Sequence, residues 1–185
     1  MRIIAIMLIT VFVSACSLFQ RDYEIVYCQP GNKPVTVYRD PTKSYSPYVR
    51  ELEGGFEGLK TTLNEVDAEL GIGKGDIKLK VQHLENKLDQ ESIRLRLSLQ
   101  TAALAMNISP CDAKDLFNSQ LTQLSKTLNT ISNVQNQIND AVVQSAGKSD
   151  PEKDQIINTA LEKAAESLDA VNNESASPSQ KKSFN

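Results

Sequence analysis

The residue types that most often carry out catalysis are scarce in this chain of 185 residues. Its single histidine, His83, lies between Lys80 and Lys87 in a charged stretch, which is typical of an exposed helix face. No serine occupies the GxSxG pattern of a nucleophile elbow. Acidic pairs such as Asp112 and Asp115 are common on helix surfaces, where the start of a helix favours negative charge. We therefore predict that the protein is not an enzyme and that it uses no metal and no cofactor.

Three cysteines are the remaining reactive groups, and the first of them, Cys16, ends a distinctive N-terminal segment. Residues 1–16 read MRIIAIMLITVFVSAC, in which the positive charge of Arg2 precedes an apolar run over residues 3–13. That run is shorter than the roughly 20 residues that a membrane-spanning helix needs, so the segment is typical of an export signal. Two small residues, Ser14 and Ala15, stand directly before Cys16.

This ending resembles the lipobox of bacterial lipoproteins, in which a small residue precedes a cysteine that is acylated on its sulfur and becomes the new N-terminus. The resemblance implies that residues 1–15 are a signal peptide, that Cys16 carries lipid, and that residues 16–22 are a tether to the membrane. Ser17 stands where an Asp favours inner-membrane retention in enterobacterial lipoproteins, so the expected location is the outer membrane, facing the periplasm. The alternative is an ordinary secretory signal in which Cys16 is incidental.

The other two cysteines, Cys28 and Cys111, form an even pair in a protein expected in an oxidising compartment. We predict a disulfide between them, which would stabilise the fold by at most about 4.5 kcal/mol in the chain-entropy model. The alternative is a catalytic or metal-binding thiol. No CxxC motif supports that alternative, and His83 is far from both cysteines in the sequence.

Residues 23–46 combine strand signals with an unusual concentration of tyrosine. Two β-branched and aromatic runs, residues 23–27 and 35–38, flank a segment rich in turn residues, which predicts a β-hairpin. All five tyrosines of the chain fall between residues 23 and 48. Because tyrosine is favoured at protein interfaces, we expect Tyr38, Tyr45 and Tyr48 to contact a partner. The alternative is that these rings cap one end of a helical body.

From Pro47 onward the apolar residues recur in steps of three and four, which predicts a helical domain over residues 47–172. Breaks near residues 71–75, 109 and 147–149 divide it into four helices, and residues 173–185 are polar enough to be a disordered tail. The glycines at 54, 55 and 58 interrupt the first helix or permit another backbone to approach it closely. The predicted fold is mostly α: an elongated four-helix bundle or a long helical hairpin with heptad packing, plus a small N-terminal β-hairpin.

Two helices carry further patterns on their faces. Ile93, Leu97 and Leu104 form a second apolar stripe in the second helix, so we expect its C-terminal half to be buried on two sides. The third helix has only two charged residues between residues 116 and 147. Amide and hydroxyl side chains can be covered without burying ions. We therefore predict that this face contacts another protein or a second copy through Gln123, Asn133 and Gln137, the alternative being an ordinary solvated face.

The charge balance and these surfaces together define the expected function. A net charge of −3 provides no basic surface for nucleic acid. The expected partners are the membrane, through the N-terminal lipid, and another envelope protein or a second copy. We therefore expect a non-catalytic, lipid-anchored interaction or scaffold subunit of a periplasmic or outer-membrane assembly. The alternatives are a blocking lipoprotein of the exclusion, immunity or inhibitor type, and a carrier of an apolar ligand.

Overall fold

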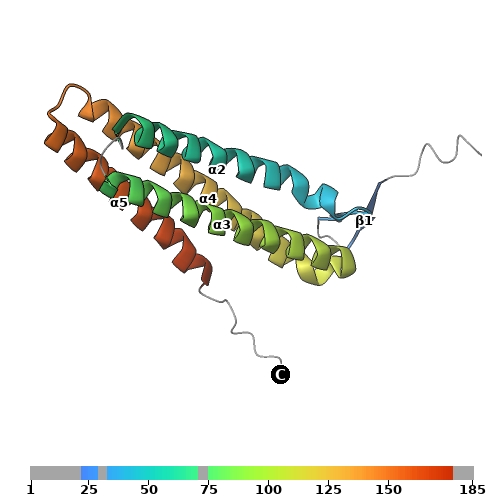
Figure 1. Ribbon diagram of the computed structural model, residues 1–185. Coiled ribbons are helices and arrows are strands. Elements are labelled where there is room, and N and C mark those ends of the chain that lie inside the picture. The colour runs from blue at the N-terminus through green and yellow to red at the C-terminus, as the bar shows by residue number, and fades with distance from the viewer. Residues whose placement is uncertain (1–21, 29–32, 71–74, 177–185) are drawn as a thin grey trace, which may run out of the picture.

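A computed structural model describes residues 22–28, 33–70 and 75–176 of the chain (Figure 1). These residues form a small sheet and a bundle of four helices, which confirms the predicted mostly α fold. In chain order the elements are β1 (Tyr23–Val26), β2 (Val35–Tyr38), α2 (Thr42–Leu70), α3 (Gly75–Ile108), α4 (Pro110–Ser145) and α5 (Asp150–Ala176). The predicted signal peptide and Cys16 lie outside the described residues, as does the tether apart from Asp22.

Neighbouring helices in the sequence run antiparallel, and charged pairs fix how α2 and α3 are aligned. Lys60 of α2 pairs with Asp89 of α3. Seven residues earlier in α2, Glu53 Oε1 lies 3.6 Å from Nη1 of Arg96, which is seven residues later in α3. The same heptad step in opposite directions is what an antiparallel pair of helices requires.

Two further ion pairs show that α3 and α5 run parallel. Lys80 Nζ lies 2.7 Å from Glu162 Oε1, and Lys87 Nζ lies 2.7 Å from Asp169 Oδ2. Both pairs join residues that are 82 positions apart in the sequence. With α4 antiparallel to each of them, the helices form an up-and-down bundle with short connections.

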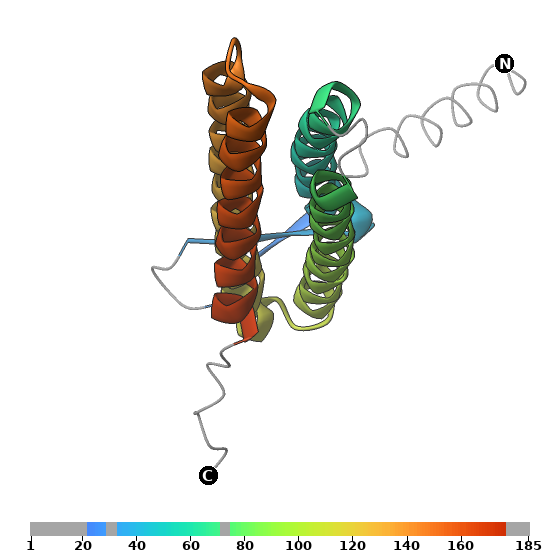
Figure 2. The same ribbon diagram turned by 60° about the vertical axis from the view of Figure 1, so that its left-hand side comes forward.

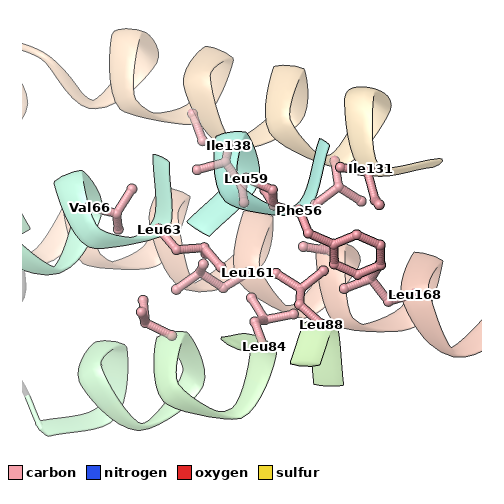
Figure 3. Close-up of a cluster of buried hydrophobic side chains, with 14 of the residues drawn as sticks. Phe56, Leu59, Leu63, Val66, Leu84, Leu88, Ile131, Ile138, Leu161 and Leu168 are labelled. Carbon is pink, nitrogen blue, oxygen red and sulfur yellow. The ribbon is translucent and has the colours of Figure 1, made fainter. Parts of the chain in front are cut away.

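The predicted heptad positions build the main core of this bundle. Leucine, isoleucine and valine side chains from all four helices meet along its axis, and Figure 3 shows part of this cluster. Its fully buried large side chains are Leu52, Leu59, Leu63, Ile77, Leu84, Leu88, Leu95, Leu99, Ile131, Ile138, Ile157 and Leu161. Burial of each such side chain contributes about 1.5–3 kcal/mol relative to leaving it exposed, so these positions provide most of the driving force for folding.

A second, smaller cluster lies at the end of the bundle where the hairpin packs. Strand β2 places its two buried residues, Val35 and Val37, against α3 and α4. The helices meet the strand with small side chains, among them Ala102, Ala103 and Ala113. Because alanine leaves space beside a helix, a strand can approach these surfaces closely. Figures 1 and 2 show the hairpin at this end, near the α3–α4 connection.

The sequence pattern predicts that the first helix begins at Pro47. In the structure, helix α2 begins five residues earlier, at Thr42. Asp40 accepts hydrogen bonds from the backbone N–H of Thr42 at 3.0 Å and from the Thr42 hydroxyl at 2.7 Å, which caps the helix. Pro47 lies within the helix. The helical body therefore starts inside the segment assigned to the hairpin.

The C-terminal boundary also differs from the prediction. Helix α5 continues to Ala176, so the first four residues of the predicted tail, 173–176, are helical. Residues 177–185 lie outside the described part of the chain. The start of helix α5 is capped by a pair of residues: the Ser149 hydroxyl donates to Glu152 Oε2 at 2.8 Å, and the Ser149 backbone N–H donates to the same oxygen at 3.2 Å.

The predicted break at the glycines of α2 does not occur, and the groups that approach these glycines are side chains of α4 rather than another backbone. The helix is continuous through residues 54–58. A Cβ atom added to Gly55 would lie 2.8 Å from Leu128 Cδ2 on α4. One turn further on, the Gln135 side-chain amide of α4 donates to the Gly58 carbonyl at 3.4 Å and to the Thr62 hydroxyl at 3.2 Å. These contacts hold α2 and α4 together.

Candidate interaction surfaces

The predicted disulfide joins Cys28, just after β1, to Cys111 in the first turn of α4, with their Cα atoms 5.3 Å apart. Cys28 and Val26 also pack against the small cluster at the hairpin end. The disulfide therefore fixes the sheet to the helical body. It leaves neither thiol free for catalysis or metal binding.

The tyrosines of the predicted contact surface divide into two groups. Tyr45 and Tyr48 lie in α2, not in the hairpin, and both pack against the two hydrophobic clusters. The Tyr48 ring meets Phe117 of α4 edge to face, with the ring centroids 6.4 Å apart. This placement favours the alternative in which the two rings cap the end of the helical body. Tyr38 lies instead in β2, on the outer side of the sheet.

The outer face of the hairpin exposes large side chains. Tyr23 of β1 and Tyr38 of β2 are cross-strand partners, and their ring centroids are 6.2 Å apart in an edge-to-face arrangement. Ile25 follows on the same face and is 42% exposed, and Tyr27 just after the strand is 72% exposed. Sequence patterning had marked the tyrosines but not Ile25. The alternation of β1 would have placed Ile25 on the same side as Tyr23.

Helix α3 carries a row of exposed aliphatic side chains, and here the sequence-based expectation is wrong. Ile93, Leu97 and Leu104 were expected to be buried, yet they are 60%, 57% and 45% exposed. Helix α3 turns its leucine heptads toward α2, α4 and α5, and no described element covers its opposite side. We call Ile93, Leu97, Leu104 and Ile108 the α3 outer stripe.

The α3 outer stripe has the spacing of a helix-packing surface. Its members follow one another in steps of four, seven and four residues, which keeps them on one face. Ile108, at the end of the helix, is 86% exposed. No charged residue occurs between Leu97 and Cys111 in the sequence. The stripe therefore ends in an uncharged region beside the hairpin.

The predicted contact residues of α4 do not share one environment. Asn133 and Gln137 are exposed, whereas Gln123 is half-buried. Gln137 lines an open groove of about 500 Å³ between α4 and α5, where Asp140 and Lys163 also lie. A smaller groove of about 210 Å³ between α2 and α4 is lined in part by Tyr48. The mixed polar lining of the larger groove offers hydrogen bonds but no enclosed volume.

The titratable groups in the described ranges include one exposed histidine and one ion pair with a nearly buried carboxylate. His83 is exposed on α3. Glu91 occupies a core position of α3 and is 5% exposed, and its Oε2 accepts a hydrogen bond from Arg94 Nε at 2.7 Å. Within the described ranges, no three His, Cys, Asp or Glu side chains gather as metal ligands would. None of the described helices combines the length and the apolar character needed to cross a bilayer.

The comparisons with known proteins give no further assignment. The chain matches no protein-family model, no curated protein and no solved structure. Function is therefore inferred from the surfaces themselves: the α3 outer stripe, the outer face of the hairpin and the uncharged face of α4.

Proposed function

We propose that the protein is a lipid-anchored, non-catalytic interaction subunit of the bacterial outer membrane that faces the periplasm. The lipobox-like residues ending at Cys16 support the anchor. The observation that carries the interaction role is the α3 outer stripe, which exposes large aliphatic side chains on a helix whose core face is already filled.

The energetics of the α3 outer stripe favour a partner. Covering an exposed Leu or Ile side chain is worth about 1.5–3 kcal/mol when burial is complete. Several such side chains on one rigid helix offer enough apolar surface for a helix-in-groove or helix-on-helix contact. Contiguous apolar patches on folded proteins commonly mark interaction sites. The partner surface that fits is itself apolar and elongated.

Nearby charges do not oppose such a contact. Arg94 and Arg96 flank the N-terminal end of the stripe, and each is already paired within the bundle, with Glu91 and Glu53 respectively. Covering the stripe therefore does not bury an unpaired arginine. From Leu97 onward the helix has no charge to desolvate.

Site-specific photo-cross-linking in intact cells tests this function. A photoreactive residue at Leu97 of the lipidated protein is expected to capture an envelope protein reproducibly. The matched control is Glu166, an exposed position on α5, where capture of the same protein is not expected. Capture of no protein at Leu97, or equal capture at both positions, would contradict the interaction role.

Two other experiments test the predicted alternatives. A blocking lipoprotein would act alone and protect cells against a specific challenge, so its removal would sensitise cells to that challenge. A carrier of an apolar ligand would release a ligand into organic solvent from purified protein.

A further inference from the structure

We propose that the outer face of the hairpin, formed by Tyr23, Ile25, Tyr27 and Tyr38, is a second membrane contact that lies at the lipid headgroup level beside the anchor. The inference rests on the proposed lipid anchor at Cys16. It adds a separate site, on β1 and β2, where the folded domain itself meets the bilayer.

The residue types on this face suit a bilayer surface. The tyrosine ring is apolar while its hydroxyl prefers water, and tyrosine is enriched where membranes meet water. Ile25, two residues after Tyr23, adds an exposed aliphatic side chain to this face. The opposite face of the sheet turns Val35 and Val37 into the end cluster, so the hairpin is amphipathic across its thickness.

The chain leaves the domain at a fixed point next to this face. The Asp22 carbonyl accepts a hydrogen bond from the Arg39 backbone N–H at 2.9 Å. The Asp22 carboxylate lies 2.7 Å from Lys43 Nζ at the start of α2. These contacts attach the residue directly before Tyr23 to both β2 and α2.

The length of the tether then limits how far the hairpin can be from the lipid. Only six residue steps separate Cys16 from Asp22. At no more than about 3.6 Å per residue, a fully extended chain reaches roughly 22 Å. The 34 residues of α3 make that helix about 50 Å long. The hairpin end of the bundle is therefore held near the membrane, whereas the opposite end is free to project away from it.

The charges around the hairpin indicate an interfacial contact rather than an electrostatic one. Asp22 and Glu24 lie on or beside β1, while Lys33 and Arg39 flank β2, so neither sign dominates. A membrane contact made by such a surface depends on tyrosine and aliphatic side chains and should be insensitive to salt. This favours a bilayer surface of either zwitterionic or anionic lipid.

Because the sequence contains no tryptophan, a single introduced tryptophan reports on one position alone. Tyr27→Trp places a single tryptophan on the hairpin face, and Val143→Trp places one near the end of α4, at the opposite end of the bundle (Figure 1). Val143 is a matched control for Tyr27, since the Tyr27 side chain is 72% exposed and the Val143 side chain is 74% exposed. Lipidated full-length protein is incorporated into phosphatidylethanolamine–phosphatidylglycerol vesicles, with or without brominated lipids that quench tryptophan.

The expected result is several-fold stronger quenching of Tyr27→Trp than of Val143→Trp, unchanged at high salt. Equal quenching of both probes would overturn the membrane contact. A blue-shifted but unquenched Tyr27→Trp emission would also overturn the membrane contact, because it indicates burial against a protein.

Vesicle flotation tests the anchor separately: Cys16→Ser should abolish flotation. If the lipidated protein floats but its hairpin probe is not quenched, only the hairpin contact fails; if Cys16→Ser floats equally well, the anchor proposal fails.

Discussion

Gly55 of α2 lies directly against Leu128 of α4, so that a Cβ atom at position 55 would be only 2.8 Å from Leu128 Cδ2. Its neighbour Gly54 is also helical, but a Cβ atom there would have nothing within 4 Å. Glycine costs a helix about 1 kcal/mol relative to alanine. A side chain at position 55 would therefore require the tip of Leu128 to shift, whereas nothing among the described residues opposes a side chain at position 54.

This contrast predicts opposite outcomes for two adjacent substitutions. Gly54→Ala should raise the free energy of unfolding by about 0.5–1 kcal/mol, because it restricts the unfolded chain without a steric cost. Gly55→Ala should be less stable than Gly54→Ala by on the order of 1 kcal/mol, because Leu128 must move. Urea denaturation of both variants measures the difference. Equal gains would show that α2 and α4 are not closely packed at Gly55.

The helices and the main core were predictable because their chemistry is periodic. Leu52, Leu59 and Leu63 already mark one face of α2 in the sequence, and that face is buried. The Cys28–Cys111 disulfide was predictable because the resemblance of the N-terminal segment to a lipobox assigns Cys16 a separate role and leaves an even pair of cysteines. In both cases the signal is contained in spacing and residue type alone.

The surfaces were harder to predict, because a pattern does not say whether a partner exists. The spacing of Ile93, Leu97 and Leu104 indicates an apolar helix face, but not whether another helix of the same chain covers it. Likewise, Tyr45 and Tyr48 were grouped with Tyr38 by proximity in the sequence. The cap formed by Asp40 places them in α2 instead, which separates them from the hairpin face.

The disulfide is predicted to stabilise the hairpin end of the molecule. Replacing Cys28 and Cys111 together with alanine should lower the free energy of unfolding by up to about 4 kcal/mol, because the unfolded chain regains the entropy of a long closed loop. Denaturation with and without a reducing agent measures this effect. The double variant is its own control, since it should not respond to the reductant. An identical denaturation midpoint for both proteins would contradict the prediction.

Glu91 is expected to depend on Arg94 for its place in the core. Arg94→Ala leaves the nearly buried Glu91 carboxylate without the Arg94 guanidinium and should cost about 1–3 kcal/mol. Glu91→Leu should be close to neutral or stabilising, because it continues the apolar row between Leu88 and Leu95. A double-mutant cycle tests the coupling. If Arg94→Ala is as harmful with Leu at position 91 as with Glu, the ion pair is not the cause.

The cap of α2 predicts a loss of stability in acid. Two hydrogen bonds from Thr42 hold the pKa of Asp40 below its ordinary value of 3.8. The larger effect comes from the Thr42 hydroxyl and the smaller from the Thr42 backbone N–H. A carboxyl whose folded-state pKa is lowered stabilises the fold above about pH 4 and loses this contribution as the pH falls through the folded-state pKa. Asp40→Asn keeps an acceptor oxygen but does not titrate. Its melting temperature should therefore fall less steeply than that of the unmodified protein below about pH 4, and parallel curves would refute this role of Asp40.

The α3 outer stripe should be dispensable for folding but not for association. Leu97→Glu with Leu104→Glu changes exposed side chains, so the free energy of unfolding should change by no more than about 0.5 kcal/mol. With the photoreactive residue moved to Ile93 of the same stripe, the double substitution should abolish cross-linking to the captured partner, because it would bury two unpaired carboxylates in an apolar contact. Circular dichroism melts and cross-linking yields measure the two effects. The matched control is Gln144→Glu with Gln155→Glu, which adds the same two negative charges at exposed positions on α4 and α5. A large loss of stability from the stripe substitutions would show that these leucines belong to the core of the fold, and unchanged cross-linking would place the partner elsewhere on the protein.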